Sequence, residues 1–265
     1  MNSTWASRRK LIYALIAIGV LILLIIIPSF LIFYKAPTCF DGKQNGGEYG
    51  VDCGGSCRKL CQSAFLSPRI EWGGAKIEKI TNGLYNIATY ISNPNINGAA
   101  VDVPYTVSLY DAQGVYITKR DGVVTLYPRR STLAFQTAVN TEKRIPAKAT
   151  FEFISAPVWF KSSDALGGIA IIDKKYIDSK DGSSLEVVLE NKTLTPYENI
   201  QVSVVLYDAG GNAIGFSQTV VDSLPINDSR NKNISQIATY TWPISRDGRV
   251  VSVEVIPSIK PIPAN

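Results

Sequence analysis

Histidine is absent from this chain of 265 residues, which limits the chemistry that the protein can perform. Histidine is the usual general base near neutral pH, the commonest neutral metal ligand and the partner of serine and cysteine nucleophiles. The glycine pairs at 73–74 and 167–168 also lack the Lys-Ser/Thr step and the following helix of a phosphate-binding loop. The sequence therefore predicts a non-catalytic protein without a cofactor.

A carboxylate pair could still hydrolyse a glycoside without histidine. The chain has 22 Asp and Glu residues, but they are scattered over predicted turns and no two are singled out. A carboxylate-dependent hydrolase therefore remains an alternative, with no catalytic residue assigned.

Charge is missing from one stretch of 24 residues, Leu11 to Tyr34. A helix of this length reaches roughly 36 Å, which exceeds a hydrocarbon core of about 30 Å. A cleaved signal peptide has a shorter apolar region, and the exit sequence from Tyr34 to Pro37 has no small-residue cleavage pattern. The residues before Cys39 do not resemble a lipidation box either. We predict an uncleaved transmembrane helix at 11–34.

Positive charge is unevenly placed around this segment, because Arg8, Arg9 and Lys10 precede it and only Lys35 follows it. The positive-inside rule predicts a cytoplasmic N-terminus at 1–10 and an ectodomain outside the cytosol, in the cell envelope. Beyond residue 35 the cations and anions nearly balance, at 23 and 22. With so small a net charge, this part of the chain provides no positive electrostatic field that would attract nucleic acid. The predicted partner of the N-terminal part is the lipid bilayer.

Cysteine is confined to one stretch, where Cys39, Cys53, Cys57 and Cys61 lie among glycine and polar residues. Such a segment cannot bury a core of its own and needs covalent links. On the oxidising side of a membrane two disulfides are expected, with three possible pairings. The spacing differs from the C-x2-C pairs of zinc sites and from an iron–sulfur triplet.

Oxygen ligands in the same stretch are candidates for a calcium site, namely Asp41, Asn45, Glu48 and Asp52. Their order does not match the EF-hand loop, and turn-forming polar residues are the simpler interpretation. With its Asp-Gly, Asn-Gly-Gly and Val-Asp-Cys-Gly-Gly steps, this cysteine-rich segment resembles a short knuckle of prokaryotic surface proteins. The resemblance implies an envelope location and no particular chemistry. We therefore predict a disulfide-rich knuckle at 35–64.

Two similar segments occur 97 positions apart, VPYTVSLYDAQG from Val103 and IQVSVVLYDAGG from Ile200. In each, alternate apolar residues predict a half-buried strand. The apolar positions are Val103, Tyr105, Val107 and Leu109 in the first segment and Ile200, Val202, Val204 and Leu206 in the second. The Asp-Ala-x-Gly step that follows predicts a tight turn and a hairpin in both segments.

Further short strands are predicted before and after these hairpins, at 85–91, 133–139, 149–154, 185–189, 236–242 and 250–256. No amphipathic helix is evident after residue 35. The pattern predicts two tandem immunoglobulin-like β-sandwiches, at 65–160 and 169–260, joined by a polar linker at 161–168 and followed by a tail at 261–265. A short polar linker also predicts that the two sandwiches unfold independently.

Around its two Leu-Tyr-Asp turns the chain resembles the FxLYD domain family, small immunoglobulin-like domains found mostly in prokaryotic envelope proteins. The matching residues are Leu109, Tyr110, Asp111 and Gly114, and then Leu206, Tyr207, Asp208 and Gly211. Val107 stands where the family has Phe. The resemblance implies no enzymatic activity, and its Leu, Tyr and Asp imply a core residue, a residue packing across the sheet and a turn cap.

The predicted function is a membrane-anchored, extracytoplasmic binding or scaffolding protein of the cell envelope. Its partner would be an envelope protein or a surface ligand that the sequence does not identify. An assembly or chaperone-like subunit of an envelope complex is the alternative. The glycosylation triplets at Asn191, Asn227 and Asn233 are common by chance and are not counted as sites.

Overall fold

The computed structural model describes residues 5–162, 167–179, 182–226, 235–242 and 249–259. The chain divides into two compact units, residues 1–56 and 57–265, and each unit is described by itself.

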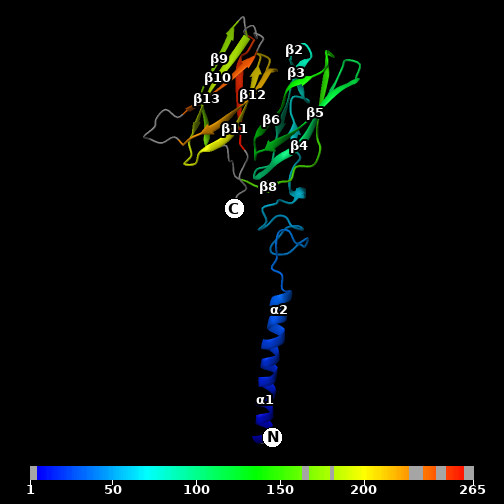
Figure 1. Cartoon of the computed structure of the whole chain (residues 1–265), viewed down its shortest axis with the longest axis vertical. Coiled ribbons are helices and arrows are strands. Elements are labelled where there is room, and N and C mark those ends of the chain that lie inside the picture. The colour runs from blue at the N-terminus through cyan, green and yellow to red at the C-terminus, as the bar shows by residue number, and fades with distance from the viewer. Residues whose placement is uncertain (1–4, 163–166, 180–181, 227–234, 243–248, 260–265) are drawn as a thin grey trace. The chain divides into compact units, whose positions relative to one another are not determined.

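The first unit begins with one apolar helix, labelled α1 and α2 in Figure 1. It comprises α1 (Trp5–Leu21), a π-helical stretch η1 (Ile22–Ile26) and α2 (Ile27–Phe33). The wider π turns end just before Pro28, which has no N–H to donate to the preceding turn. The 27 residues from Ser7 to Phe33 are long and apolar enough to cross a membrane, a property that a signal sequence shares.

The remainder of the first unit is a run of turns in which glycine supplies the conformations that other residues avoid. Gly55 illustrates this, because its φ is +58° and a Cβ placed there would lie 1.9 Å from the carbonyl oxygen of Gly47. Cys39 and Cys53 in this unit, and Cys57 and Cys61 in the second, are all disulfide-bonded. The prediction that no cysteine is free is therefore confirmed.

The second unit starts with a short 3-10 turn, η2 (Gln62–Ala64), and continues into a first β-sandwich. One sheet contains β1 (Arg69–Ile70), β2 (Lys76–Thr81), β3 (Leu84–Ser92) and β6 (Ser131–Asn140). The other contains β4 (Gly98–Tyr110), β5 (Tyr116–Leu126), β7 (Lys148–Phe153) and β8 (Phe160–Lys161). The segment before β1 packs on this sandwich. The Leu60 N–H donates to the Trp159 carbonyl, and the rings of Phe65 and Trp159 stack.

The second β-sandwich also consists of two antiparallel sheets. One sheet contains β9 (Ile169–Ser179), β10 (Gly182–Asn191) and β13 (Ser235–Trp242). The other contains β11 (Tyr197–Tyr207), β12 (Ala213–Leu224) and β14 (Ser252–Ser258). Most of the strands predicted from alternation are thereby confirmed within the described residues, and the fold is mainly β with two immunoglobulin-like sandwiches.

The pairing order is the same in both sandwiches. In the first, β3 pairs with β2 and β6, and β4 pairs with β5 and β7. In the second, β10 pairs with β9 and β13, and β11 pairs with β12 and β14. The central strands β4 and β11 carry the apolar positions assigned to them, and all eight are buried.

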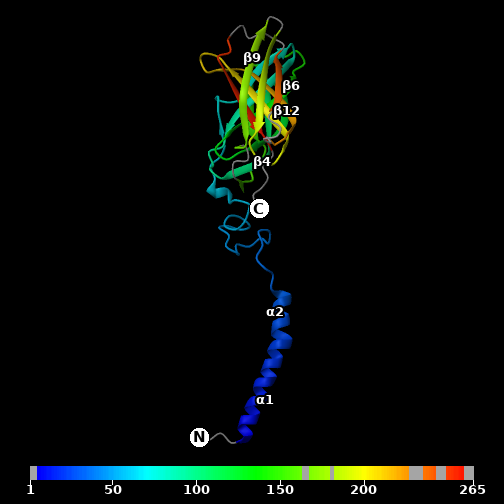
Figure 2. The same ribbon diagram turned by 90° about the vertical axis from the view of Figure 1, so that its left-hand side faces the viewer.

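The two sandwiches dock on each other through a third apolar cluster, here named the docking cluster. Its buried members are Ala88 and Leu133 from the first sandwich and Val205 and Phe216 from the second. Partly buried residues packed against them are Trp72, Tyr90, Phe135, Tyr207, Ala213 and Ile256. Figure 1 shows the second sandwich beside the first, and Figure 2 shows it from the side on which β9 lies.

The docking cluster changes the expectation that the two sandwiches, joined by the linker at 161–168, unfold independently. Residues 163–166 of this linker lie outside the described residues. A polar linker alone favours two independent domains, whereas a shared buried cluster couples their unfolding. We therefore expect the sandwiches to unfold together.

Candidate binding site between the two sandwiches

The four residues considered for calcium lie close together in the turns of the first unit. Both carboxylate oxygens of Asp52 accept from the Gly42 N–H, at 3.1 and 3.0 Å. One oxygen of Glu48 accepts the N–H groups of Asn45 and Asp52, at 3.3 and 3.2 Å. The Asn45 amide donates to Asp41 at 3.0 Å and is the main cause that lowers the pKa of Asp41. These carboxylates act as turn acceptors, the simpler of the two interpretations of the sequence, and calcium binding stays the untested alternative.

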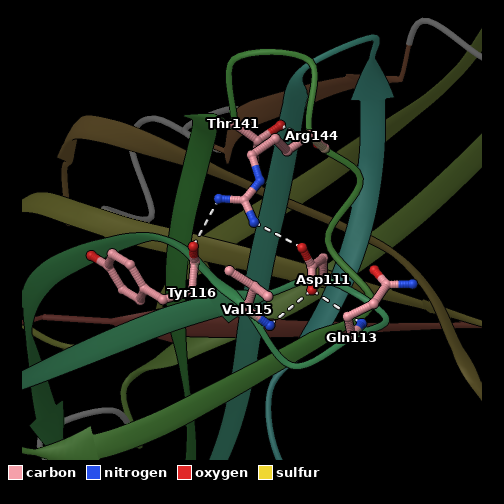
Figure 3. Close-up of polar contacts among 6 residues, drawn as sticks. All are labelled: Asp111, Gln113, Val115, Tyr116, Thr141 and Arg144. Atoms are coloured by element: carbon pink, nitrogen blue, oxygen red, sulfur yellow. Dashed lines mark hydrogen bonds and ion pairs between the residues drawn. The ribbon is translucent and has the colours of Figure 1, made fainter.

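The Asp111 turn in the first sandwich is closed by its own backbone and by an arginine, as Figure 3 shows. Asp111 Oδ1 accepts the N–H groups of Gln113 at 3.1 Å and Val115 at 2.8 Å. Its other oxygen accepts from the Arg144 guanidinium at 2.8 Å, and Arg144 also donates to the Tyr116 carbonyl. The Val115 N–H and then Arg144 hold the pKa of Asp111 below its usual value.

The Asp208 turn in the second sandwich has the same backbone arrangement. Asp208 Oδ1 accepts the N–H groups of Gly210 and Asn212 at 2.9 and 2.8 Å. The Asn212 side chain is the main cause that lowers the pKa of Asp208. In both turns the aspartate therefore caps the turn, as the resemblance implied.

Asn191 is the first residue of one of the three glycosylation triplets, and its side chain is engaged in hydrogen bonds within the fold. Its amide is buried and donates to the carbonyls of Thr195 and Leu224, at 2.8 and 3.2 Å. Its oxygen accepts from Thr193 at 2.7 Å. The other two triplets, at Asn227 and Asn233, lie outside the described residues.

A cavity of about 400 Å³ lies between the two sandwiches and is the candidate binding site. We name it the intersandwich pocket. Residues of the first sandwich that line it are Asp102, Tyr105, Val123, Val124, Thr125, Thr132, Leu133 and Phe135. Those of the second are Asn199, Gln201, Ser203, Gln218, Val220, Ile256, Ser258 and Ile259. Its volume falls in the range of about 300–1,000 Å³ that is usual for small-ligand pockets.

The floor of the pocket is the outer face of the sheet formed by β12, β11 and β14. Strand pairing places Ser203 between Gln218 and Ile256, and it places Gln201 between Val220 and Ser258. Each floor row thus has one apolar and two polar side chains.

Further along the same face the character changes. The next row is Phe216, Val205 and Glu254, and its apolar residues belong to the docking cluster. One sheet face therefore has an apolar half, covered by the first sandwich, and a polar half that lines the pocket.

Buried and partly buried polar contacts hold the two walls together next to the pocket. Tyr90 of the first sandwich and Tyr207 of the second donate to the two oxygens of Glu254, at 2.5 and 2.8 Å. The buried Glu78 accepts the Phe216 N–H at 3.1 Å. These contacts cross from one sandwich to the other and fix the width of the pocket.

At the other side of the pocket Tyr127 links the sandwiches again. Its hydroxyl lies 2.7 Å from Ser258 Oγ and donates to the Ile259 carbonyl. Burial raises the pKa of Tyr127 to about 12. The hydroxyl is therefore held as a neutral donor at neutral pH.

Two residues that line the pocket adopt the left-handed backbone conformation. Asp102 has φ of 51° and lies in the β-bulge of β4, and Asn199 has φ of 52° where the pairing of β11 with β12 is interrupted. They occupy corresponding positions, since each directly precedes the similar segment of its sandwich. Asp and Asn tolerate this conformation better than other side chains do. Such bulges re-aim side chains and are frequent next to binding sites.

The arrangement can bind through hydrogen bonds and apolar contact. Gln218 donates to Ser203 Oγ at 2.8 Å, and Gln136 donates to the Tyr105 hydroxyl at 2.9 Å. Gln201 and Asn199 make no side-chain hydrogen bond within the described part of the chain. Asp102 is the only carboxylate among the described residues that line the pocket, which leaves no carboxylate pair there.

The fold and the pocket together define a protein with two docked β-sandwiches and an apolar N-terminal helix. No protein-family model matches the chain, and no curated protein matches it. Among solved structures, a Bacteroides fragilis protein described as a proposed beta-galactosidase shares 15% identity over 67% of this chain, with a TM-score of 0.18. The chain spans about a third of that protein, 32% of its length.

A second structure, the formate complex of the Lactobacillus farciminis oxalate decarboxylase, shares 10% identity with a TM-score of 0.11. It matches 72% of this chain and 85% of its own chain. Likenesses this weak support no argument about the activity of the present chain.

Sequence reasoning did not find the intersandwich pocket. The outward positions of β11 read Asn199, Gln201 and Ser203 and then turn apolar at Val205 and Tyr207. An apolar end on an otherwise polar sheet face indicates a covered surface. That change is the one signal that could have indicated where the sandwiches dock and where the pocket begins.

Proposed function

We propose that this chain is a membrane-anchored, non-catalytic binding protein of the cell envelope that holds its ligand in the intersandwich pocket. The observation that carries the proposal is the division of one sheet face into a closed apolar half and a hollowed polar half. Pockets at the junction of two domains are a common place for small ligands. The buried contacts across the junction keep this pocket formed before a ligand arrives, which reduces the cost of binding.

The proposed location outside the cytosol rests on two features. The apolar helix is preceded by three cations and followed by one, which favours an uncleaved span with a cytoplasmic N-terminus. Disulfides at all four cysteines fit an oxidising compartment.

Membership of the FxLYD family and an origin by tandem duplication are part of the proposal. Their support is the common pairing order of the strands and the two similarly capped Asp turns, at Asp111 and Asp208. A non-catalytic role is supported by the absence of histidine from the sequence. It is also supported by Asp102 being the single carboxylate among the described residues that line the pocket.

Hydrogen exchange tests whether the pocket is a ligand site. The detergent-solubilised full chain would be incubated with four separate fractions of a cell-envelope extract, namely neutral glycans, anionic small molecules, peptides and lipids. We expect one fraction to slow amide exchange at Asn199–Ser203 and Val123–Thr125, and not at the Asp111 turn. If no fraction protects these segments more than the turn does, the proposed binding function is wrong.

A second candidate, an assembly or chaperone-like subunit, is favoured by strand β9. This strand is an edge of its sheet within the described residues, and its side chains Ile171, Ile172 and Ile177 are exposed. An exposed edge can add a strand from another chain. However, Lys174 and Lys175 lie on the same strand, and such charges protect edges against pairing, so ligand binding in the pocket is preferred.

A further inference from the structure

We infer that the intersandwich pocket takes a neutral, hydroxyl-rich ligand, a short oligosaccharide lying across the outer face of β11 and its neighbours. This inference rests on the proposed function, because it names the ligand class of the same pocket.

Recognition at the centre of the floor comes from side chains. Strand β11 lies inside its sheet and is hydrogen-bonded on both sides, to β12 and to β14, so its backbone groups are occupied there. An extended peptide that adds to a sheet needs an unpaired edge, which β11 does not offer. A ligand that lies across β11 is therefore bound by side chains.

The side chains of the floor are amides and hydroxyls. Gln201, Gln218 and Asn199 each carry both donors and an acceptor, while Ser203 and Ser258 can donate or accept. Neighbouring hydroxyls of a sugar also donate and accept, so this mixture matches them. Gln201 and Asn199, with no side-chain bond inside the described chain, lose no internal contact when they bind.

The charges of the residues that line the pocket disfavour anionic ligands. No Lys or Arg is among the described residues that line the pocket, and Asp102 adds a negative charge. A phosphate, sulfate or carboxylate ligand would meet no opposite charge among these lining residues. A carboxylate instead accepts strong hydrogen bonds from neutral hydroxyl groups.

Apolar side chains supply the remaining contact surface. Val220 and Ile256 alternate with the polar residues of the floor, and Phe135 and Leu133 approach from the first sandwich. A sugar ring has carbon-bound hydrogens on its faces and hydroxyls at its rim, so it matches a surface with both characters. A fully polar ligand would leave these residues without a partner.

Saturation-transfer NMR on the detergent-solubilised full chain tests the inference. The probes are neutral di- and tetrasaccharides of glucose, galactose, mannose and N-acetylglucosamine, with inorganic phosphate and a neutral tripeptide for comparison. We expect saturation of the ring protons of at least one sugar. The variant Gln201→Trp, which fills the floor, should weaken that signal by about tenfold or more.

The matched control is Gln113→Trp, which places the same ring on the exposed hairpin tip. This control should bind the sugar as the wild type does, and both variants should keep the unfolding temperature of the wild type within the error of the measurement. A third variant, Gln201→Ala, should weaken sugar binding without filling space, which identifies the amide as a ligand contact.

The outcomes separate this inference from the proposed function. If the glycan fraction does not protect the pocket in hydrogen exchange but the peptide or anionic fraction does, the pocket binds and the sugar assignment is wrong. If a sugar binds equally well to Gln201→Trp and to the wild type, its site lies elsewhere and the inference is overturned. If no probe and no fraction reaches the pocket, both proposals fail.

Discussion

Glu254 is the residue that joins the two sandwiches most closely, because its two oxygens accept from tyrosines of different sandwiches. Burial, and then the neighbouring Glu254 carboxylate, raise the pKa of Tyr90 and of Tyr207. Trp72, with φ of 57°, stacks on Tyr90 at a centroid distance of 5.0 Å and packs against Phe216. Its positive φ belongs to the tight turn that the Gly74 N–H closes on the Glu71 carbonyl, at 3.1 Å.

These tyrosines predict how stability depends on pH. A group whose pKa is higher in the folded state contributes stability that is complete below its unfolded pKa, about 10 for tyrosine. That contribution is lost as the pH rises toward the folded pKa, which is about 12 for Tyr127. We therefore expect the free energy of unfolding to fall above pH 10.

Tyrosinate absorbance, followed during alkaline titration, checks this expectation. Tyr90, Tyr127 and Tyr207 should ionise later than the exposed tyrosines, and only on unfolding. The variant Glu254→Gln should allow Tyr90 and Tyr207 to ionise earlier while leaving Tyr127 unchanged. A single titration step near pH 10 for all tyrosines would show that the junction is open to solvent.

Arg144 offers a second test at the scale of single residues. It donates to Asp111 at 2.8 Å, and it contributes to the lowered pKa of that carboxyl (Figure 3). The variant Arg144→Ala should raise the pKa of Asp111, although the Val115 N–H will keep it below the usual value. Carboxyl-carbon NMR during acid titration measures this, and Asp208 in the other hairpin serves as the internal control.

The sign of the acid effect follows from the same linkage. A carboxyl whose folded pKa is lowered contributes stability above its unfolded value, and this contribution is lost as the pH falls through the folded pKa. Asp111→Asn should therefore reduce stability at neutral pH and leave it nearly unchanged in strong acid. An equal loss at both pH values would mean that the charge of Asp111 is unimportant.

At the scale of elements, β4 and β11 are the central strands of their sheets. Leu109 and Leu206 are fully buried in them, in the cores of the first and second sandwich. Leu→Ala at either position should cost about 2–5 kcal/mol, the usual range for a buried leucine. Chemical denaturation measures this, and Val115→Ala at the exposed hairpin tip should change stability by less than about 0.5 kcal/mol. Insensitivity at both leucines would contradict the strand faces described above.

The element scale also shows how far the sequence could predict this fold. Alternation at Val103 to Leu109 and at Ile200 to Leu206 indicated the inward faces correctly, because a two-residue period places every second side chain in the core. The Asp-Ala-x-Gly turns were equally predictable, since Gly114 and Gly211 adopt φ of +77° and +75°. These are local signals that need no knowledge of the neighbouring domain.

The candidate site could not be predicted in the same way. Val205 lies on the outward face of β11, where alternation assigns solvent, yet it is fully buried because the first sandwich covers it. Gln201 and Ser203 resemble any polar sheet face until Phe135 and Leu133 are placed opposite them. Docking of two domains is a property of distant segments, so one strand does not encode it locally.

At the scale of the whole molecule, the docking cluster joins the two sandwiches beside the intersandwich pocket. Without it, Gln201 and Thr132 would belong to separate surfaces, and no pocket would exist between them. Phe216→Ala, which removes the largest buried side chain of the cluster, should loosen the junction and raise the solvent exposure of Trp72. Tryptophan quenching measures this exposure, and Phe151→Ala in the first core is the control, since it should destabilise without freeing Trp72.

The charges around the apolar helix predict the membrane topology of the whole chain. We expect residues beyond Lys35 to be accessible to protease from outside intact cells or spheroplasts, since three cations precede the helix and one follows it. Replacing Arg8, Arg9 and Lys10 by neutral residues and adding lysines after Lys35 should disturb this orientation. Protection of the ectodomain until the cells are lysed would contradict the proposed location.

Differential scanning calorimetry of the full chain in detergent tests the central claim, that the two sandwiches form one body around the pocket. Cooperative domains unfold together when a large buried surface joins them. We expect a single unfolding transition, and we expect Leu109→Ala and Leu206→Ala each to lower it as a whole. Two transitions, with each leucine variant shifting only the transition of its own sandwich, would contradict the claim.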